Sequence, residues 1–180
     1  MTLVLVLGGA RSGKSRLAIT LAREQRQPVI FLATGQAGDT EMADRIARHR
    51  AERPPGWETI EEPLRLTGII AQADEHSCLV LDCLSLWVSN ALESSSAVVI
   101  ETRAAVAADA AKKRQGLTIA VSNEVGLGIV PMHPLGRDYR DLLGRVNSIW
   151  AEHAEQALFV VAGRALRLDR TPRLAQLLDD

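Results

Sequence analysis

The sequence predicts an α/β fold in which a mostly parallel sheet carries helices on both faces. Five short apolar runs, each the length of one buried strand, occur at residues 3–7, 29–33, 78–82, 117–121 and 157–161. Stretches with helical periodicity separate these runs, and strands that alternate with helices favour a parallel sheet. A glycine-rich segment joins the first run to the first helix, at the sheet edge where ligands of such folds collect.

The glycine-rich segment, residues 8–15, reads GGARSGKS and matches the phosphate-loop pattern G-x-x-x-x-G-K-[ST] at every fixed position. In such a loop the backbone N–H groups converge on an anion, and the following helix adds the positive end of its dipole. Lys14 is expected to contact the β- and γ-phosphates, and the Ser15 hydroxyl to bind Mg²⁺. The other residues of the predicted loop are Gly8, Gly9, Ala10, Arg11, Ser12 and Gly13. The sequence therefore predicts a P-loop NTPase fold that binds a nucleoside triphosphate.

Length and composition predict a single globular domain over residues 1–180, with 47% hydrophobic and 24% charged residues. The net charge of −1 gives no reason to expect nucleic-acid or membrane binding. No apolar run is long enough to span a bilayer, and residues 1–7 lack the length and charge of a leader. Cys78 and Cys83 have neither the spacing of a zinc site nor that of a C-x-x-C pair. We therefore expect thiols in a reducing compartment, the cytoplasm.

The remaining periodicity predicts helices at residues 14–26, 41–53, 64–73, 84–92, 97–115 and 136–155, and a short strand at residues 57–61. Pro28 blocks continuation of the first helix, and the segment Pro54–Gly56 ends the second. Asp39 or Thr40 can cap the start of that second helix. The Arg- and Leu-rich tail to Asp180 shows no clear pattern.

Asp82 closes the third apolar run and is the candidate for the second acid that a P-loop enzyme needs near its metal ion. An acid at the carboxyl end of a strand near the phosphate loop has the context of a Walker-B aspartate. The same residue also precedes the predicted helix that begins near Leu84, where it could act as a cap. The two roles are compatible.

The second predicted helix carries Arg45, His49 and Arg53 at i, i+4 and i+8, so these three side chains share one face. Arg48 and Arg50 flank the histidine, and nearby cations favour a neutral, nucleophilic imidazole. The same arginines could hold a triphosphate whose α-phosphorus that imidazole attacks. From the residues alone the simpler interpretation is a solvated, arginine-rich helix with internal Glu41–Arg45 and Asp44–Arg48 pairs.

Several other residues are weaker candidates. His76, His133 and His153 have contexts more typical of structural or solvent-facing histidines. Glu124 follows the fourth apolar run, where it could position a hydroxyl or sense the nucleotide, or could equally cap its loop. Trp57 and Trp87 could stack on a base, although core packing is the simpler role for each.

Taken together, the motifs resemble those of the bifunctional enzyme adenosylcobinamide kinase/adenosylcobinamide-phosphate guanylyltransferase of cobalamin biosynthesis. The matching segments are GGARSGKS, the loop after FLAT, RIARHRAERP, LVLDCLSLWVSN, VSNEVGLGIVP and RDYRDLLGRVN. They cover essentially Leu3 to Gly163, in the order and spacing of that family. The resemblance implies a RecA-like P-loop fold, a homotrimer, and two reactions at one nucleotide site.

In the first implied reaction, ATP or GTP phosphorylates the aminopropanol hydroxyl of adenosylcobinamide. In the second, GTP transfers GMP to that phosphate through a guanylylated histidine, with Mg²⁺ as cofactor. The family's histidine falls on His49, which favours the catalytic interpretation of its helix. Some members carry a second histidine just before it, where this chain has Arg48. The implied nucleotide contacts fall on residues 8–15 and on Ala33, Thr34, Gly35, Arg50, Ala51, Glu52, Arg53, Glu61 and Asp82.

Both reactions need the helix that bears His49 to approach the phosphate loop, and we expect this helix to move when GTP binds. A plain small-molecule kinase without a covalent step is the alternative enzyme. A GTPase-type switch is less supported, because the chain has no Asn-Lys-x-Asp segment for reading guanine.

Overall fold

The computed structural model describes residues 3–170, apart from the side chain of Arg45, and folds them around one seven-stranded sheet. The strand order is β3-β2-β4-β5-β1-β6-β7, and all neighbouring strands are parallel except β6 and β7. β5 therefore separates the strand before the phosphate loop from the strand that ends in Asp82, as in RecA-like folds. The strands are β1 (Leu3–Gly8), β2 (Val29–Ala33), β3 (Glu58–Glu61), β4 (Cys78–Asp82), β5 (Thr118–Val121), β6 (Gln156–Val161) and β7 (Arg164–Leu168).

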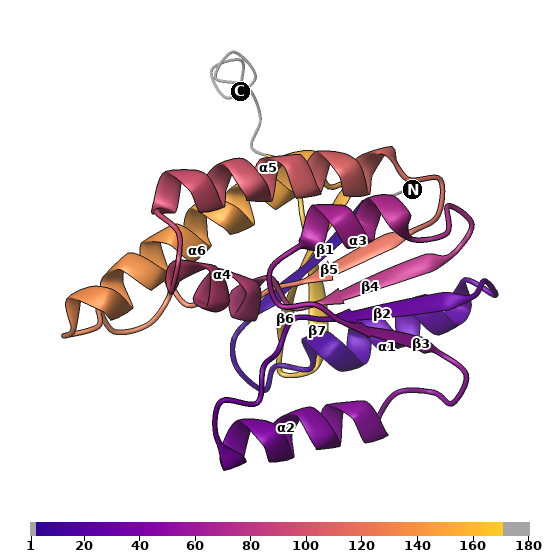
Figure 1. The fold of residues 1–180 in the computed structure, drawn as a ribbon, viewed down its shortest axis with the longest axis horizontal. Helices are drawn as coiled ribbons and strands as arrows, with labels where there is room; N and C mark the ends of the chain where they lie inside the picture. Colours follow the sequence, from indigo (N-terminus) through magenta and orange to yellow (C-terminus); the bar gives the residue numbers. More distant parts are fainter. Residues whose placement is uncertain (1–2, 171–180) are drawn as a thin grey trace.

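Helices cover both faces of the sheet (Figure 1). Successive strand residues point to opposite faces, so Val4 and Val6 pack with Ala18 of α1, whereas Leu3 and Leu5 pack with α3, α4, α5 and α6. The helices are α1 (Lys14–Glu24), α2 (Thr40–Ala51), α3 (Leu66–Gln72), α4 (Leu84–Leu92), α5 (Ala97–Lys113) and α6 (Pro134–His153). None of the helices within residues 3–170 is both long and apolar enough to cross a membrane.

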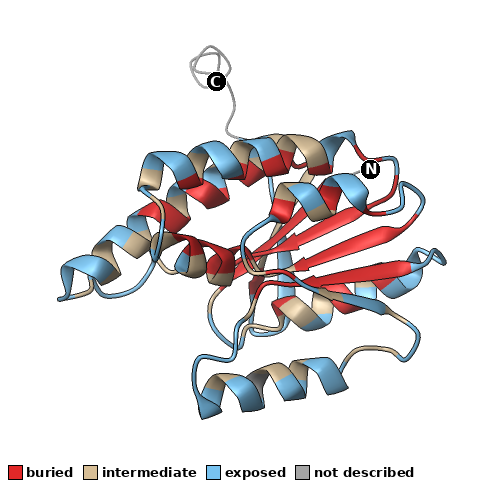
Figure 2. Ribbon diagram, viewed as in Figure 1, coloured by how far each residue is buried: buried red, intermediate tan, exposed pale blue. Residues whose placement is uncertain are grey.

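α2 differs from the other long helices because none of its described residues is buried. In Figure 2 the central strands β1, β2, β4 and β5 and the inner stripes of α5 and α6 are red, while α2 is tan and pale blue along its whole length. α2 contributes no residue to either core cluster. Its position is thus determined by its cap and by contacts at the edge of the sheet.

The predicted fold class is confirmed, and most elements lie within two residues of their predicted bounds. All five apolar runs are strands, and the helix predicted at residues 84–92 is α4. The sixth helix begins at Pro134 rather than Gly136, because His133 Nδ1 accepts a hydrogen bond from the Leu135 backbone N–H at 3.3 Å. The sequence did not reveal β7, whose residues are all exposed and which pairs antiparallel with β6.

The carboxyl ends of the parallel strands bring distant residues together at one edge of the sheet. Ala33 at the end of β2 pairs in register with Glu61 of β3 on one side and Asp82 of β4 on the other. Asp82 in turn is in register with Val121 of β5. The phosphate loop leaves β1 at this same edge, so sheet topology alone places it near Asp82.

Candidate nucleotide site

The phosphate loop is shaped by two glycines for which a side chain would be costly. Gly13 is the N-cap of α1 and has φ 102°, a left-handed conformation that a Cβ disfavours. A Cβ on Gly8 would lie 2.4 Å from the Val160 carbonyl oxygen. The turn between β6 and β7 also supports the loop, because the Gly163 N–H donates to the Ser12 carbonyl at 2.9 Å.

Polar residues of the loop line the cavity in which a phosphate would bind. Lys14 is only 7% exposed, and its Nζ donates to the Gly9 carbonyl at 2.6 Å. The Ser12 hydroxyl oxygen is buried without a hydrogen-bond partner among the described residues. A buried hydroxyl without a partner is costly, and a bound anion would supply its acceptor. The N-terminus of α1 faces the same place and favours negative charge.

Asp82 lies next to the loop, where its carboxylate interacts with the Ser15 side chain. Burial raises the pKa of the Asp82 carboxyl, whereas His49, the Ser15 hydrogen bond, Arg53 and Lys14 act to lower it. The helix that follows has Cys83 as its N-cap, with no side-chain cap hydrogen bond. Asp82 is therefore not a helix cap, and its carboxylate faces the loop.

Thr34, which follows β2, fixes the end of β4 through two hydrogen bonds with the Cys83 backbone. Its hydroxyl donates to the Cys83 carbonyl at 2.7 Å and accepts from the Cys83 N–H at 2.9 Å. The Asn90 side chain adds a hydrogen bond to the Thr34 carbonyl at 2.8 Å. Thr34 is fully buried, so it positions the strand end beside Asp82 and does not itself line the cavity described below.

α2 lies across this edge and brings His49 to it. The helix begins at an Asp39 cap whose side chain accepts from the Met42 N–H at 2.7 Å. His49 is 35% exposed, and its Nδ1 lies 4.0 Å from the Asp82 carboxylate, which is 14% exposed. His49 therefore lies beside Asp82 at the sheet edge, and the movement of this helix on GTP binding stays a prediction. Arg48 donates from Nε to the Asp44 carbonyl at 3.4 Å rather than to its carboxylate.

The end of α2 and the residues after it carry two arginines with different surroundings. Arg50 forms an ion pair with Glu61, and both side chains are more than half exposed. The Arg53 guanidinium lies 3.9 Å above the Phe31 ring, and one terminal nitrogen donates to the Thr59 hydroxyl at 3.3 Å. Burial lowers the pKa of Arg53, and Nε has no hydrogen-bond partner among the described residues.

One cavity of about 900 Å³ lies between the loop, α1, α2 and the strand ends. Its walls include most of the predicted site residues: Ala10, Arg11, Ser12, Gly13, Lys14, Ser15, Ala33, Gly35, His49, Glu52, Arg53, Glu61 and Asp82. The predicted residues outside this lining are Gly8, Gly9, Thr34, Arg50 and Ala51. Gly8 and Gly9 act through their backbone, since Gly8 O accepts from Glu124 N at 3.0 Å and Gly9 O accepts from Lys14.

The cavity also contains residues that sequence reasoning did not select. They are Arg16, Ile19, Thr20, Arg23, Glu41, Met42, Ile46, Cys83, Leu86, Val121, Asn123, Ala162 and Gly163. Arg48, which the sequence offered as a triphosphate contact, also lines the cavity. The helical spacing of Arg16, Ile19, Thr20 and Arg23 was a usable signal, because it places all four on one face of α1. Ala162 and Gly163 gave none, since the strand that follows them was not predicted.

The donor set suits a magnesium ion bound together with a nucleotide. Mg²⁺ prefers oxygen ligands and commonly uses one or two protein side chains with phosphate and water. The Ser15 hydroxyl and the Asp82 carboxylate both line the cavity at the loop and interact with each other. Within residues 3–170 no group of three or more His, Cys, Asp or Glu side chains is placed to hold a metal ion. The remaining ligands of a magnesium ion would therefore come from nucleotide phosphate and water.

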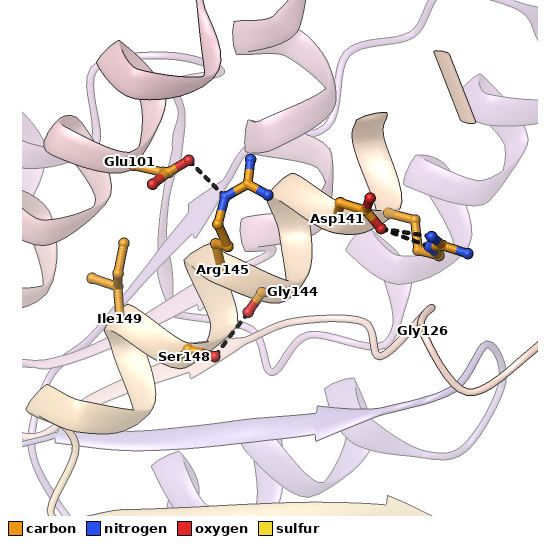
Figure 3. Close-up of a pocket in the computed structure, with 8 residues that line it drawn as sticks. Glu101, Gly126, Asp141, Gly144, Arg145, Ser148 and Ile149 are labelled. Carbon is orange, nitrogen blue, oxygen red and sulfur yellow. Dashed lines mark hydrogen bonds and ion pairs between the residues drawn. The ribbon is translucent and has the colours of Figure 1, made fainter. Parts of the chain in front are cut away.

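Figure 3 shows a second hollow, of about 710 Å³, on the side of α6 that faces α5. Its charged side chains are paired with each other. Arg145 Nε donates to Glu101 of α5 at 2.7 Å, and Arg140 Nε donates to Asp141 at 2.8 Å. The hollow shares no residue with the nucleotide cavity, and its satisfied ion pairs identify it as a helix–helix contact.

The weaker candidates have structural surroundings. Glu124 accepts a hydrogen bond from the Gly126 N–H at 2.6 Å, as a loop cap would. Trp57 stacks on Phe31 with ring centroids 6.5 Å apart. Trp87 is 1% exposed and donates from its indole nitrogen to the Leu64 carbonyl at 2.9 Å. Core packing is thus the role of both tryptophans.

Comparisons with known proteins identify relatives over almost the whole chain. The family model described as cobinamide kinase/cobinamide phosphate guanyltransferase matches residues 4–168. The chain is 44% identical over 169 residues to the bifunctional adenosylcobalamin biosynthesis protein CobP of Pseudomonas aeruginosa, with 93% of this chain and 98% of that protein covered. It is 36% identical over 182 residues to the corresponding protein CobU of Escherichia coli, covering 92% and 99% of the two chains.

Among solved structures, the KaiC-like protein PH0186 of Pyrococcus horikoshii is similar in fold, with a TM-score of 0.51 and 14% identity. The match covers 88% of this chain and 70% of that one. This likeness concerns the fold alone, whereas the family model and the two curated relatives extend over almost the whole chain. The chain therefore belongs to the cobinamide kinase/cobinamide phosphate guanyltransferase family.

Proposed function

We propose that this protein phosphorylates adenosylcobinamide with ATP or GTP and then transfers GMP from GTP to the adenosylcobinamide phosphate. The observation that carries the proposal is the position of His49, whose imidazole lies beside Asp82 in the wall of the same cavity as Lys14 and Ser15. A plain kinase has no need of an imidazole at this point, because phosphoryl transfer depends mainly on positioning and charge neutralisation.

In the kinase step, the loop N–H groups and Lys14 hold the β- and γ-phosphates while the acceptor hydroxyl attacks the γ-phosphorus. The bond from the γ-phosphorus to the bridging oxygen breaks, the acceptor hydroxyl loses its proton to solvent, and the nucleoside diphosphate leaves. Ser15 and Asp82 would hold Mg²⁺, which neutralises phosphate charge when bound.

In the guanylyl step, His49 is the proposed nucleophile. Its Nδ1 faces the Asp82 carboxylate, so Nε2 is the nitrogen whose lone pair attacks the α-phosphorus of GTP. A phosphorus–nitrogen bond forms and pyrophosphate departs into the loop. A phosphate oxygen of the acceptor then attacks the same phosphorus, the bond to nitrogen breaks, and neutral His49 returns. Asp82 stabilises the cationic imidazole of the intermediate through its negative charge.

The nucleotide-contacting role of the α2 end is also part of the proposal. Arg53 supplies a partly buried cation beside the cavity, with an Nε that has no partner among the described residues. Glu61 and the backbone around Ala33 and Gly35 would contact the nucleoside, because they lie along the carboxyl edge next to Asp82. This arrangement supports one nucleotide position for both reactions.

We further propose a homotrimer located in the cytoplasm. Support for assembly comes from large apolar side chains exposed between β5 and α6, including Leu127 at 80%, Ile129 at 97% and Met132 at 97%. Support for a reducing compartment comes from Cys78 and Cys83, neither of which forms a disulfide. Light scattering of the wild-type chain and of an Ile129→Asp/Met132→Asp variant tests the assembly, and a mass unchanged by the variant contradicts it.

The test of the covalent step is incubation with Mg²⁺ and GTP labelled in the α-phosphate. The expected product is protein that carries an acid-labile, base-stable label, as a phosphoramidate does. His49→Ala should abolish the label while sparing part of the γ-phosphate transfer, and His153→Ala is the matched control that should keep both. A label that survives His49→Ala overturns the assignment. Intact γ-phosphate transfer by a wild-type protein that never takes the label supports the plain kinase instead.

A further inference from the structure

The outer face of α1 forms a wall of the nucleotide cavity that the proposed nucleotide contacts leave unused. Arg16, Ile19, Thr20 and Arg23 recur at i, i+3, i+4 and i+7 and all line the cavity. Arg16 and Arg23 are exposed, and their guanidinium groups make no hydrogen bond or ion pair within residues 3–170. A helix face with two unpaired arginines in a cavity wall has the chemistry of an anion site.

The opposite wall of the cavity comes from α2 and combines apolar side chains with a cation. Met42 and Ile46 line the cavity there, and the Ile46 side chain lies close to Gly35. Arg48 adds a third cation, which is exposed and whose contact is only the weak hydrogen bond to the Asp44 carbonyl. Glu41 is the one carboxylate on this half of the lining. The wall therefore joins apolar side chains to a cation next to His49.

The α1 wall and the α2 wall lie on either side of the proposed reaction centre. Arg16 follows Ser15 directly in the chain, and Arg48 directly precedes His49. Arg23 lies seven residues beyond Arg16, which is about 10 Å farther along α1 at the helical rise per residue. The proposed nucleotide contacts occupy the other half of the lining, from His49 to Arg53 and across to Glu61.

We propose that the space between these α1 and α2 walls is the acceptor site, which takes a phosphate monoester attached to a large, partly apolar molecule. Arg16 and Arg48 bind the acceptor phosphate from opposite sides and hold it against the phosphorus on His49. Ile19, Met42 and Ile46 contact the apolar part of the acceptor, and Arg23 donates to its polar groups farther out. This inference rests on the proposed function, since it names where the second substrate of the guanylyl step binds.

The two halves of the guanylyl step allow a direct test. Protein labelled from α-phosphate-labelled GTP is isolated and then mixed with adenosylcobinamide phosphate, and the loss of label is followed over time. Arg16→Gln and Arg48→Gln should take the label as the wild type does but pass it on more slowly at limiting acceptor. Loss of one charge-assisted hydrogen bond predicts a decrease of about 10- to 100-fold, mainly in the acceptor KM.

Arg26→Gln is the matched control, because Arg26 follows the end of α1 and is exposed but does not line the cavity. It should label and transfer like the wild type. Unchanged transfer by both Arg16→Gln and Arg48→Gln overturns the acceptor site, and so does loss of labelling in either, which would assign that arginine to the nucleotide.

Failure of the proposed function appears differently, as a wild-type protein that never takes the label. Calorimetric binding of adenosylcobinamide phosphate to unlabelled protein then still tests the site, with weaker binding expected for both variants and not for Arg26→Gln.

Discussion

Arg53 is partly buried and Arg114 is buried, and the two differ in how many hydrogen bonds their guanidinium groups form within the fold. The terminal nitrogens of Arg114 make five hydrogen bonds, to the carbonyls of Ile70, Ala73, Asp74 and Ser77 and to the Ser77 hydroxyl. Arg53 makes one, to Thr59 at 3.3 Å, and otherwise rests on the Phe31 ring. Burial lowers the pKa of both guanidinium groups.

The difference separates a structural cation from one kept for a ligand. Arg114 binds carbonyls at the end of α3, where the helix dipole is negative and the last carbonyls lack partners. Both terminal nitrogens of Arg114 donate within the fold, and only its Nε has no hydrogen-bond partner among the described residues. Arg53 lines the cavity beside Asp82 and keeps most of its donors for a molecule that the fold itself does not supply.

The largest expected effect comes from breaking the structural member of the pair. Arg114→Met leaves several buried carbonyls without donors, and we expect the free energy of unfolding to fall by about 3 kcal/mol or more. Urea unfolding followed by circular dichroism measures this change. The fraction that remains folded should still take the GTP label, and an unfolding midpoint equal to that of the wild type contradicts the structural role.

Breaking the other member should affect binding rather than stability. Arg53→Met keeps an apolar contact with Phe31 but removes the charge, so we expect GTP affinity to fall by about 10- to 100-fold. Equilibrium binding of GTP measures this loss, and thermal unfolding without nucleotide should change little. A midpoint shift comparable to that of Arg114→Met would show that both arginines are structural.

The titration of the Cys78 thiol, on which the Arg114 charge acts, gives a prediction for the pH dependence of stability. Burial raises the pKa of the Cys78 thiol to about 11, although Arg114 acts to lower it. The folded state thus holds its proton at a pH where the unfolded chain has lost it, so stability present below the unfolded-state pKa is lost as pH rises through the folded pKa. We expect the unfolding free energy to decline between about pH 9 and pH 11, with a contribution of up to about 1.4 kcal/mol per pH unit.

Urea titrations of the wild type and Cys78→Ala at several pH values isolate this contribution. The difference in unfolding free energy between the two proteins should shrink as pH rises. A constant difference would mean that the Cys78 thiol titrates alike in the folded and unfolded chains.

The smallest effect is expected for Arg50, which is more exposed than either arginine of the pair. Its ion pair with Glu61 has side chains that are 60% and 54% exposed, so solvent screens the attraction. Arg50→Gln should change the unfolding free energy by less than about 1 kcal/mol. Thermal unfolding in low and high salt checks this, and a loss near that of Arg114→Met would contradict it.

The sequence predicted the fold where burial dictates it. Four of the five apolar runs become strands that are buried along most of their length, and the alanine-rich α5 buries one face, so their residue types alone predict them. The fifth run, β6, is only partly buried. β7 escaped because pairing with β6 and the Ala162–Gly163 turn stabilise it, while all its side chains are exposed. The start of α6 was misplaced because a histidine cap is an uncommon N-terminal signal.

In the site, likewise, a contiguous motif could be predicted from the sequence, whereas a contact between distant segments could not. The phosphate loop is contiguous, so Lys14 and Ser15 could be named from spacing and chemistry. The approach of His49 to Asp82 depends on β2 lying beside β4 and on α2 crossing the sheet edge. No periodicity within α2 encodes that approach, which is why the residues alone favoured a solvated helix and the family resemblance decided for His49.

The hydrogen bond from the Gly163 N–H to the Ser12 carbonyl links the β6–β7 hairpin to the phosphate loop, which lies far earlier in the chain. β1 pairs with β5 and β6, which leave the ribosome more than 100 residues later. During synthesis the phosphate loop therefore exists long before its neighbours, and we expect nascent chains that stop short of residue 163 to hold nucleotide poorly. Nucleotide binding in this protein would then mark a chain whose translation has reached the closing hairpin.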